Sequence, residues 1–389
     1  MELSKLFKGF FSERAGGLIL LFCTIISLLI ANSVWGESYT SFWHRYADLS
    51  FSNIQLNYSI EHWINDGLMA IFFLLVGLEI ERELYIGELA GIKNAMLPVA
   101  AAIGGMAVPA FIYFLFTNGT PGQSGAGIPM ATDIAFALGM LSLLGSRVPG
   151  SIKIFLTALA IIDDLGAILV IVIFYNTGVS WIFLSAALAI FILLFIMGKK
   201  GINNLWFYLI PGIVMWYCMM QSGVHATITG VLLAFAIPFG KKGGSHPSER
   251  LQHFLHRPVA FFILPIFALA NTGILVSNQW LTDMMSRTSL GVIVGLVIGK
   301  PLGILTASFL IIKSGLAKLP NGVNWKHIFG VSLLGGIGFT MSIFIANLAF
   351  SDLEMIRTAK ISILAASAIA CIAGLFVLYK IKIPAKAEE

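Results

Sequence analysis

The chain alternates between long apolar runs and short polar connections almost to its C-terminal end. A helix needs about 20 mainly apolar residues to cross a bilayer, and twelve runs approach this length. Each of them is therefore predicted to be a membrane span. The predicted spans lie near residues 13–32, 60–84, 95–116, 123–144, 151–175, 180–198, 203–219, 223–239, 252–273, 289–312, 327–350 and 357–381.

Glycine interrupts the fourth and eleventh predicted spans, in the stretches GQSGAGIPMATD and SLLGGIGFTMS. A single glycine in a membrane helix often marks close helix packing, but glycine has poor helix propensity, and a cluster indicates local unwinding. Unwound backbone at membrane depth is tolerated only where it faces protein or a water-filled cavity. We therefore predict two interrupted helices that cross at the membrane midplane.

Each interrupted span is the middle member of a three-span group, residues 95–175 or residues 289–381. Interrupted helices in corresponding positions indicate a transporter built from inverted repeats. We predict an all-α polytopic membrane protein in which residues 1–389 form one transporter domain. Helices 3–5 and 10–12 form its repeated core, and the remaining helices form an interface part.

The composition indicates a membrane protein and limits the classes of partner that it is expected to bind. Hydrophobic residues make up 58% of the chain and charged residues 11%, against about 25% charged in soluble domains. The three cysteines lie singly in apolar segments, which predicts neither a disulfide framework nor a metal site. No basic patch indicates nucleic acid, so the expected partner is the lipid bilayer.

The basic residues predict the orientation of the chain, because cytoplasmic loops are enriched in Lys and Arg. With twelve spans, most of them fall on the side that also holds both termini. Both termini are therefore predicted to be cytoplasmic. The connection between the first two spans is then outside, and its alternating sequence HRYADLSFSNIQLNYSI predicts a short β-hairpin near residues 44–60.

Two adjacent aspartates, Asp163 and Asp164, lie inside the apolar fifth span, in TALAIIDDLGAIL. A carboxylate at this depth costs about 2.5–3.5 kcal/mol on insertion scales, so ion or proton handling is the default hypothesis. Neighbours on a helix point about 100° apart, so the two cannot hold one ion as a simple fork. Lys300 is the cation that lies inside a predicted span, and it is the natural partner for one of them.

This set of groups predicts an exchange reaction. Two carboxylates and a lysine that lie close together titrate as a coupled set. Carboxylate oxygens also bind hard cations. Competition between protons and Na⁺ for one site is then sufficient for antiport, although a purely structural ion pair remains an alternative.

Thr132 and Asp133 lie in the break of the fourth span. Helix ends carry about half a unit of charge, positive at N-termini and negative at C-termini. We expect Asp133 to compensate a pair of N-termini and Lys300 a pair of C-termini. Thr132 either offers its hydroxyl to a cation or bonds back to its own helix.

The end of the second span reads GLEIERELYIGE, and Glu79, Arg82 and Glu83 share one face of this helix. Such a cluster is usually a solvated helix end. His225 is a single histidine at the end of a span, and a structural hydrogen bond is its common role. His253, at a predicted inner boundary, is a weak candidate for pH sensing, because histidine titrates near neutrality.

The chain resembles the NhaA family of bacterial Na⁺/H⁺ antiporters over essentially its full length. The matching stretches are FFLLVGLEIERE, PMATDIAFALG, LTALAIIDDLGAI, GVHATITGVLLAF, GKPLGI and GGIGFTMSIFI. The resemblance implies electrogenic exchange of cytoplasmic Na⁺ or Li⁺ for external H⁺, with two protons per cation and activation at alkaline pH. It implies a homodimer in the bacterial cytoplasmic membrane that has no cofactor and is not an enzyme.

The same resemblance assigns roles to residues of this chain. It implies that Asp163 and Asp164 bind the cation and protons, with Asp164 the main cation ligand, and that Thr132 lines their site. Asp133 is the acidic residue of the crossing, and Lys300 pairs with Asp163 or balances the crossing. Residues linked to the pH response are Glu79, Arg82, Glu83, His225 and His253.

One position departs from the family pattern, because Gln252 replaces an acidic residue in the pH-response cluster. This change puts the pH profile in doubt rather than transport itself. The main alternative function is cation-coupled symport of a small solute. An intramembrane aspartyl protease is disfavoured because its GxGD motif is absent, and a passive channel would not need titratable groups at its centre.

Overall fold

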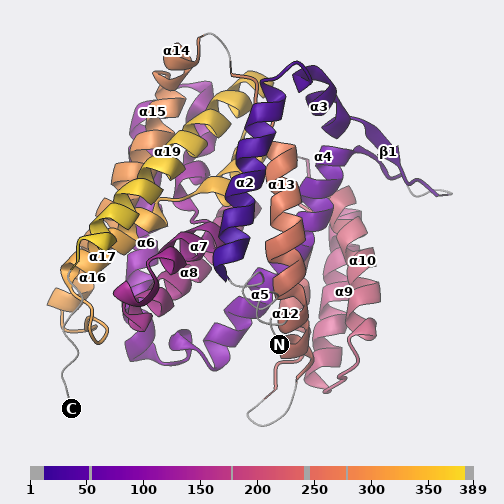
Figure 1. Ribbon diagram of the computed structural model, residues 1–389. Helices are drawn as coiled ribbons and strands as arrows, with labels where there is room; N and C mark the ends of the chain where they lie inside the picture. The colour runs from indigo at the N-terminus through magenta and orange to yellow at the C-terminus, as the bar shows by residue number, and fades with distance from the viewer. Residues whose placement is uncertain (1–12, 52–54, 177, 241–245, 277–278, 382–389) are drawn as a thin grey trace, which may run out of the picture. The chain divides into compact units, whose positions relative to one another are not determined.

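The computed structural model describes residues 13–51, 55–176, 178–240, 246–276 and 279–381, and helices dominate them (Figure 1). The helices up to the middle of the chain are α2 (Glu13–Ala31), α3 (Gly36–Trp43), α4 (Ile60–His62), α5 (Met69–Tyr85), α6 (Ile92–Thr117), α7 (Ile134–Leu143), α8 (Gly150–Phe174) and α9 (Trp181–Lys199). The helices that follow are α10 (Trp206–Gln221), α11 (Ile228–Ala236), α12 (Pro247–Pro258), α13 (Leu264–Asn271), α14 (Trp280–Met284), α15 (Arg287–Val294), α16 (Lys300–Lys313), α17 (Trp325–Gly335), α18 (Phe339–Ala349) and α19 (Leu353–Tyr379). The predicted all-α membrane fold is confirmed.

Length and composition identify the described helices that could cross a membrane. Among the described residues, seven helices are long and apolar enough to cross a membrane, and up to ten if each of three bent pairs is one span. The predicted span at 203–219 overlaps α10 and the one at 223–239 contains α11, and these helices have only 16 and 9 residues. The count of twelve spans therefore stays a prediction. The cytoplasmic location of both termini also stays a prediction, because residues 1–12 and 382–389 lie outside the described part.

Both interrupted spans are broken where the glycine clusters predict. The 3-10 segment Pro121–Met130 meets α7 at a bend of 44°, and α17 meets α18 at a bend of 43°. Three other spans stay continuous through a π-helical turn, at Trp63–Leu68, Val259–Ile263 and Gly295–Gly299.

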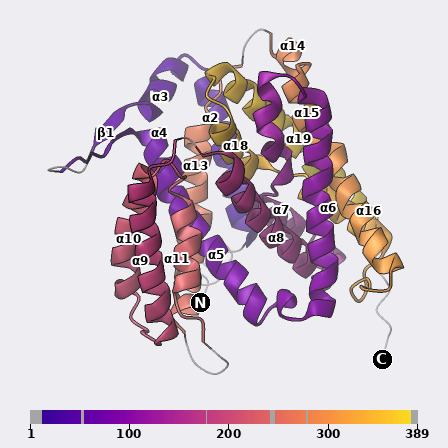
Figure 2. The same ribbon diagram turned by 180° about the vertical axis from the view of Figure 1, so that it is seen from behind.

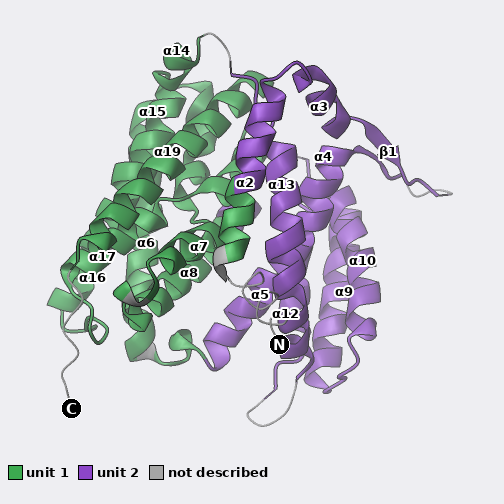
Figure 3. Cartoon of the chain, in the orientation of Figure 1, with its two compact units in different colours: residues 1–21, 87–167, 277–389 green, residues 22–86, 168–276 purple. Residues whose placement is uncertain are grey.

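The chain divides into two compact units (Figure 3). Unit 1 comprises residues 1–21, 87–167 and 277–389, and it therefore holds most of both predicted three-span groups. Within it, α6 and α16 lie side by side (Figure 2). Their backbones touch, since a Cβ atom on Gly303 would lie 2.0 Å from the carbonyl oxygen of Gly104. Small residues that let backbones approach are typical of membrane helix packing.

Unit 2 comprises residues 22–86 and 168–276 and contains α5 and α9 to α13. It also contains two short strands, β1 (Tyr46–Asp48) and β2 (Asn57–Ser59), which pair antiparallel with Ala47 opposite Tyr58. These strands lie in the stretch 44–60 for which a hairpin is predicted, and residues 52–54 between them are outside the described part.

Candidate functional site

The candidate site lies in unit 1, where the two broken helices meet. Between Met130 and α7 the chain is extended, and Asp133 caps the N-terminus of α7 by accepting a hydrogen bond from the backbone N–H of Phe136, 2.9 Å. The second break falls between α17 and α18. A backbone bond joins the breaks, because the N–H of Asp133 donates to the carbonyl oxygen of Ile337 at 2.7 Å.

The Asp133 carboxylate also reaches the second broken helix. Its Oδ2 atom accepts hydrogen bonds from the backbone N–H of Thr340, 3.0 Å, and from the Thr340 hydroxyl, 2.5 Å. Thr340 lies in the first turn of α18. One buried carboxylate therefore serves the N-termini of both α7 and α18, where partial positive charge accumulates.

Lys300 contacts the opposite kind of helix end, a C-terminus, where partial negative charge accumulates. Its Nζ atom donates to the carbonyl oxygen of Met130, the last residue of the 3-10 segment Pro121–Met130. The same Nζ atom lies 2.9 Å from Oδ2 of Asp163, and both side chains are 0% exposed. The π-helical turn Gly295–Gly299 directly precedes Lys300. Of the two adjacent aspartates, Asp163 is therefore the lysine's direct partner.

Thr132 completes the contacts of Asp163. Its Oγ1 atom lies 2.7 Å from Asp163 Oδ2 and 2.9 Å from the carbonyl oxygen of Gly335. A hydroxyl has one hydrogen to donate, so it serves one of these acceptors at a time, and neither belongs to its own helix. Among the described residues, Oδ1 of Asp163 accepts no hydrogen bond. Asp164 follows on α8 and is 1% exposed.

This arrangement offers hard oxygen atoms and movable protons in a dry environment. Two carboxylates and a hydroxyl are oxygen ligands of the type that small cations prefer. Among the described residues, no group of three or more His, Cys, Asp or Glu side chains is suited to a metal ion.

Comparison with known proteins decides the family. Residues 8–378 match the family described as Na⁺/H⁺ antiporter 1. The chain belongs to this family. The resemblance to NhaA antiporters that the sequence motifs predict is confirmed.

Several curated relatives are similar to the antiporter over almost their whole length. The present chain is 58% identical over 379 residues to the Na⁺/H⁺ antiporter NhaA of Flavobacterium psychrophilum, and the match covers 97% of each chain. It is 56% identical over 375 residues to the Na⁺/H⁺ antiporter NhaA 1 of Flavobacterium johnsoniae, covering 96% of each. The solved sodium proton antiporter MjNhaP1 from Methanocaldococcus jannaschii has a TM-score of 0.53 and 14% identity over 94% of this chain and 92% of that one. That likeness supports the fold alone.

The antiporter's predicted pH-response residues lie in unit 2, and the structure brings some of them together. Arg82 Nη2 lies 3.1 Å from Glu83 Oε1 at the end of α5. Glu79 Oε1 lies 3.9 Å from Nδ1 of His256 on α12. His253 is exposed on α12, while Gln252 beside it is buried.

His225 has the geometry of a structural residue. Its Nε2 atom lies 2.7 Å from the carbonyl oxygen of Tyr175. A histidine that donates to a backbone carbonyl is held in one tautomer by that bond. The contact gives His225 a fixed place in unit 2.

Sequence reasoning missed one buried carboxylate of the antiporter, Glu81. Its side chain is 5% exposed, and its Oε2 atom accepts a hydrogen bond from the Ser248 hydroxyl at 3.1 Å. The signal was available, because Leu74 and Leu78 place Glu81 on the buried face of α5. Asp66, another acidic residue within the predicted span 60–84, lies in the π-helical turn 3.1 Å from Nε2 of His62.

Proposed function

We propose that the antiporter moves Na⁺ or Li⁺ out of the bacterial cytoplasm in exchange for external H⁺, with two protons per cation. It does so in the cytoplasmic membrane as a homodimer with both termini inside, and it needs no cofactor. The observation that carries this proposal is the burial of Asp163, Asp164 and Lys300 at the meeting point of two broken helices.

Competition between the cation and protons for the same carboxylates couples the outward movement of the cation to the inward movement of protons. Lys300 and Thr132 both contact Oδ2 of Asp163. A cation that binds between the two aspartates needs both in the carboxylate form, so it displaces the proton of Asp164. It also takes over Asp163 from Lys300, and this step releases the second proton from the Asp163–Lys300 pair.

The charges of these states make the cycle electrogenic. With Asp164 protonated and Asp163 paired to the Lys300 ammonium, the three side chains sum to zero. With the cation bound and two protons gone, the sum is one negative charge. Each cycle then carries one positive charge inward, and a potential of 100 mV inside negative contributes about 2.3 kcal/mol to it.

At the crossing of the two broken helices, charged side chains compensate the partial charges of the helix ends inside the membrane. Asp133 offsets the positive N-termini of α7 and α18, and Lys300 offsets the carbonyl end at Met130. We propose that alternating access is a motion of the core formed by 95–175 and 289–381. Labelling of single-cysteine variants from each side of the membrane tests this motion.

The response to alkaline pH belongs to unit 2 in this proposal. Glu79, Arg82, Glu83 and His253 act together at the ends of α5 and α12, and His225 contributes through its bond to Tyr175. The contact of His256 with Glu79 joins α12 to α5. Gln252, which lies buried beside His253, has no ionisable group.

Everted membrane vesicles with an imposed pH gradient test the proposed exchange. Addition of Na⁺ or Li⁺ should dissipate the gradient for the unchanged antiporter and not for Asp164→Asn, which removes the main cation carboxylate. Asp48→Asn, which neutralises an exposed carboxylate in the hairpin, should behave as wild type. Exchange by Asp164→Asn at the wild-type rate would refute the assigned site.

The same vesicles separate antiport from the alternative function. Vesicles washed free of organic solutes still contain everything that Na⁺/H⁺ exchange requires. A symporter would need its solute before the pH gradient responded to Na⁺. Exchange in washed vesicles therefore supports antiport, and exchange that appears only with an added solute supports symport.

A further inference from the structure

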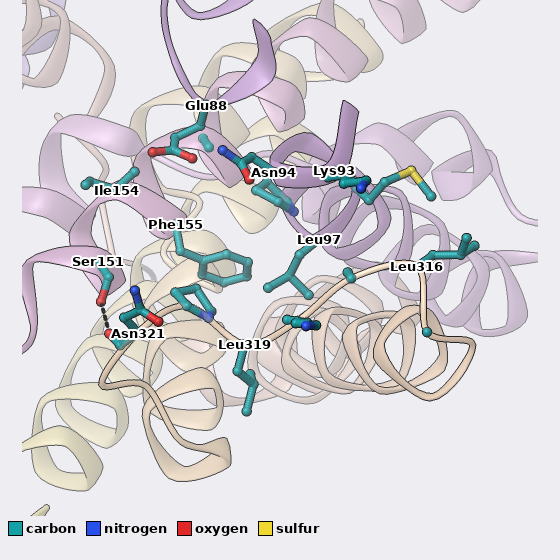
Figure 4. A pocket seen from close by; sticks show the side chains of 17 residues that line it. Glu88, Lys93, Asn94, Leu97, Ser151, Ile154, Phe155, Leu316, Leu319 and Asn321 are labelled. Atoms are coloured by element: carbon teal, nitrogen blue, oxygen red, sulfur yellow. Dashed lines mark hydrogen bonds between the residues drawn. The ribbon is translucent and has the colours of Figure 1, made fainter. Parts of the chain in front are cut away.

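A cavity of about 730 Å³ opens at one end of unit 1, and none of the candidate ion-site residues lines it (Figure 4). Its walls come from three parts of the chain. These are the start of α6, the first turns of α8, and the segment 315–321 that follows α16. The Ser151 hydroxyl on α8 donates to the carbonyl oxygen of Asn321 at 2.8 Å and closes one side. Every lining residue belongs to unit 1.

The cavity has an apolar interior and a polar rim. Leu97 and Phe155 are buried in its wall, while Ile154 and Leu316 line it with about half of their surface exposed, 49% and 56%. Exposed apolar side chains in a hollow are binding surface for an apolar ligand. The volume lies within the range of about 300–1,000 Å³ that ligand pockets occupy.

The rim is basic. Lys93 lines it from the start of α6 and Lys318 from the segment 315–321, and both are exposed, while Asn94 and Asn321 add side-chain amides. Glu88 is the acidic residue of the lining. The connections at this end of unit 1 carry further cations outside the cavity, at Arg147, Lys153, Lys313 and Lys326.

Both helices that open on the cavity do so with their N-terminal turns, at Asn94 of α6 and Ser151 of α8. These ends carry partial positive charge. The cavity therefore combines two ammonium groups, two amides and two helix N-termini above an apolar floor. An amphiphile with an anionic head group has the complementary chemistry.

The depth of the cavity matches that of lipid head groups. A helix rises 1.5 Å per residue, so Ser151 lies about 18 Å along α8 from Asp163. Half of the hydrocarbon core of a bilayer is about 15 Å. With Asp163 near the midplane, the rim of the cavity lies just beyond the hydrocarbon boundary. The excess of Lys and Arg at this end predicts that it is the cytoplasmic one.

From this geometry we propose that the cavity binds an anionic phospholipid of the inner leaflet. The phosphate group lies between Lys93 and Lys318, and hydroxyl groups of a glycerol head group bond to the side chains of Asn94 and Asn321. One acyl chain enters the cavity along Phe155 and Leu319. The bound lipid bridges the start of the first repeat and the segment that leads from α16 into α17.

Native mass spectrometry of the delipidated full-length protein with added phosphatidylglycerol tests this site. The double variant Lys93→Gln/Lys318→Gln should bind the lipid about 25-fold more weakly, since each lysine near an anionic head group contributes roughly fivefold. Lys313→Gln/Lys326→Gln removes the same charge from the same end without touching the cavity, and it should bind as wild type. Equal weakening in both double variants would overturn the site.

A second variant tests the acyl chain. Leu319→Trp fills the half-buried wall of the cavity and keeps both lysines, so it should also lose the lipid. Wild-type binding by Leu319→Trp would show that no acyl chain enters. Displacement of the lipid by equimolar glycerol 3-phosphate would show that the site takes a soluble anion instead. Both results contradict the proposal.

Photocrosslinking of the unaltered protein locates the lipid without relying on any variant. Phosphatidylglycerol with a diazirine in its acyl chain should label peptides that contain residues 93–98, 151–158 and 315–321. Labelling confined to other segments would refute the assignment. The readout is lipid position, so it is independent of ion exchange and separates this proposal from the proposed function.

Discussion

Lys300 and Asp163 depend on each other because neither side chain touches solvent. Taking a charge out of water costs several kcal/mol, and an opposite charge at hydrogen-bond distance offsets that cost. The pair is therefore held together by the penalty for separating it. Under the proposed mechanism, a cation that binds Asp163 has to offset that penalty.

A double-mutant cycle on Lys300 and Asp163 measures this dependence. Lys300→Met and Asp163→Asn alone should each lower stability by about 3–5 kcal/mol, because each leaves one uncompensated buried charge. The double variant should be less destabilised than the sum of the two. Denaturation of the purified protein in detergent gives the three values.

The more exposed pair of Arg357 with Asp283, 3.3 Å apart, provides the control cycle. Both side chains are about a quarter exposed or less, so the pair is wetter than Lys300–Asp163 and its coupling should be about 1 kcal/mol. Simple additivity at Lys300 and Asp163 would show that the two charges are not paired in solution.

At the scale of elements, the breaks were predictable and the partners were not. The glycine clusters predicted both interruptions, because glycine lowers helix propensity. Spacing along α8 left open which aspartate faces Lys300, because it does not reveal which neighbouring helix each side chain meets. The family resemblance offered pairing with Asp163 as one of two roles for Lys300. The π-helical turns, such as Gly295–Gly299 before Lys300, also escaped prediction, because one extra residue in a turn leaves no mark on composition.

Asp133 should stabilise two helices at once, and substitutions separate its contributions. Asp133→Asn loses the charge and keeps one acceptor oxygen, enough to cap one of the two N-termini, whereas Asp133→Ala loses both caps. We expect a loss of about 1 kcal/mol for each cap removed, so Ala should unfold at a lower temperature than Asn. Asp352→Ala, which removes one exposed cap of α19, is the matched control and should have the smallest effect.

The close contact between α6 and α16 should not tolerate one added methyl group. Gly303→Ala places a Cβ atom 2.0 Å from a backbone oxygen of Gly104, and backbone cannot move aside as a side chain can. Overpacking of this kind costs about 1–3 kcal/mol. Gly150→Ala meets nothing within 4 Å and should be close to neutral. Equal melting temperatures for the two variants would contradict the close packing.

At the scale of the whole molecule, the sequence predicted the fold class and the family more securely than the number of spans. Apolar runs mark membrane segments whether or not each becomes one long helix. The run at 223–239 contains the 9-residue helix α11, which is too short to cross alone. Hydropathy records where a chain is buried in lipid or protein, while helix length depends on the turns that tertiary packing imposes.

The exchange ratio belongs to the whole molecule and has a simple test. With two protons per cation and no membrane potential, a tenfold proton gradient should balance a cation gradient of about a hundredfold, because each tenfold ratio is worth the same free energy of about 1.4 kcal/mol. Proteoliposomes clamped at zero potential with valinomycin and K⁺ locate the gradient at which net flux vanishes. Balance at a tenfold cation gradient would establish a one-to-one ratio.

The backbone bond from Asp133 to Ile337 has a consequence for how this protein tolerates change. A carbonyl oxygen offers the same acceptor whatever side chain its residue carries, so position 337 can vary in identity without loosening the bond. Its place in the chain cannot vary. One residue added or removed between Gly335 and Phe339 would set a different carbonyl opposite Asp133 and carry Thr340 away from the carboxylate. A change of side chain at position 337 should therefore leave this bond intact, whereas a change in the number of residues between Gly335 and Phe339 should break it.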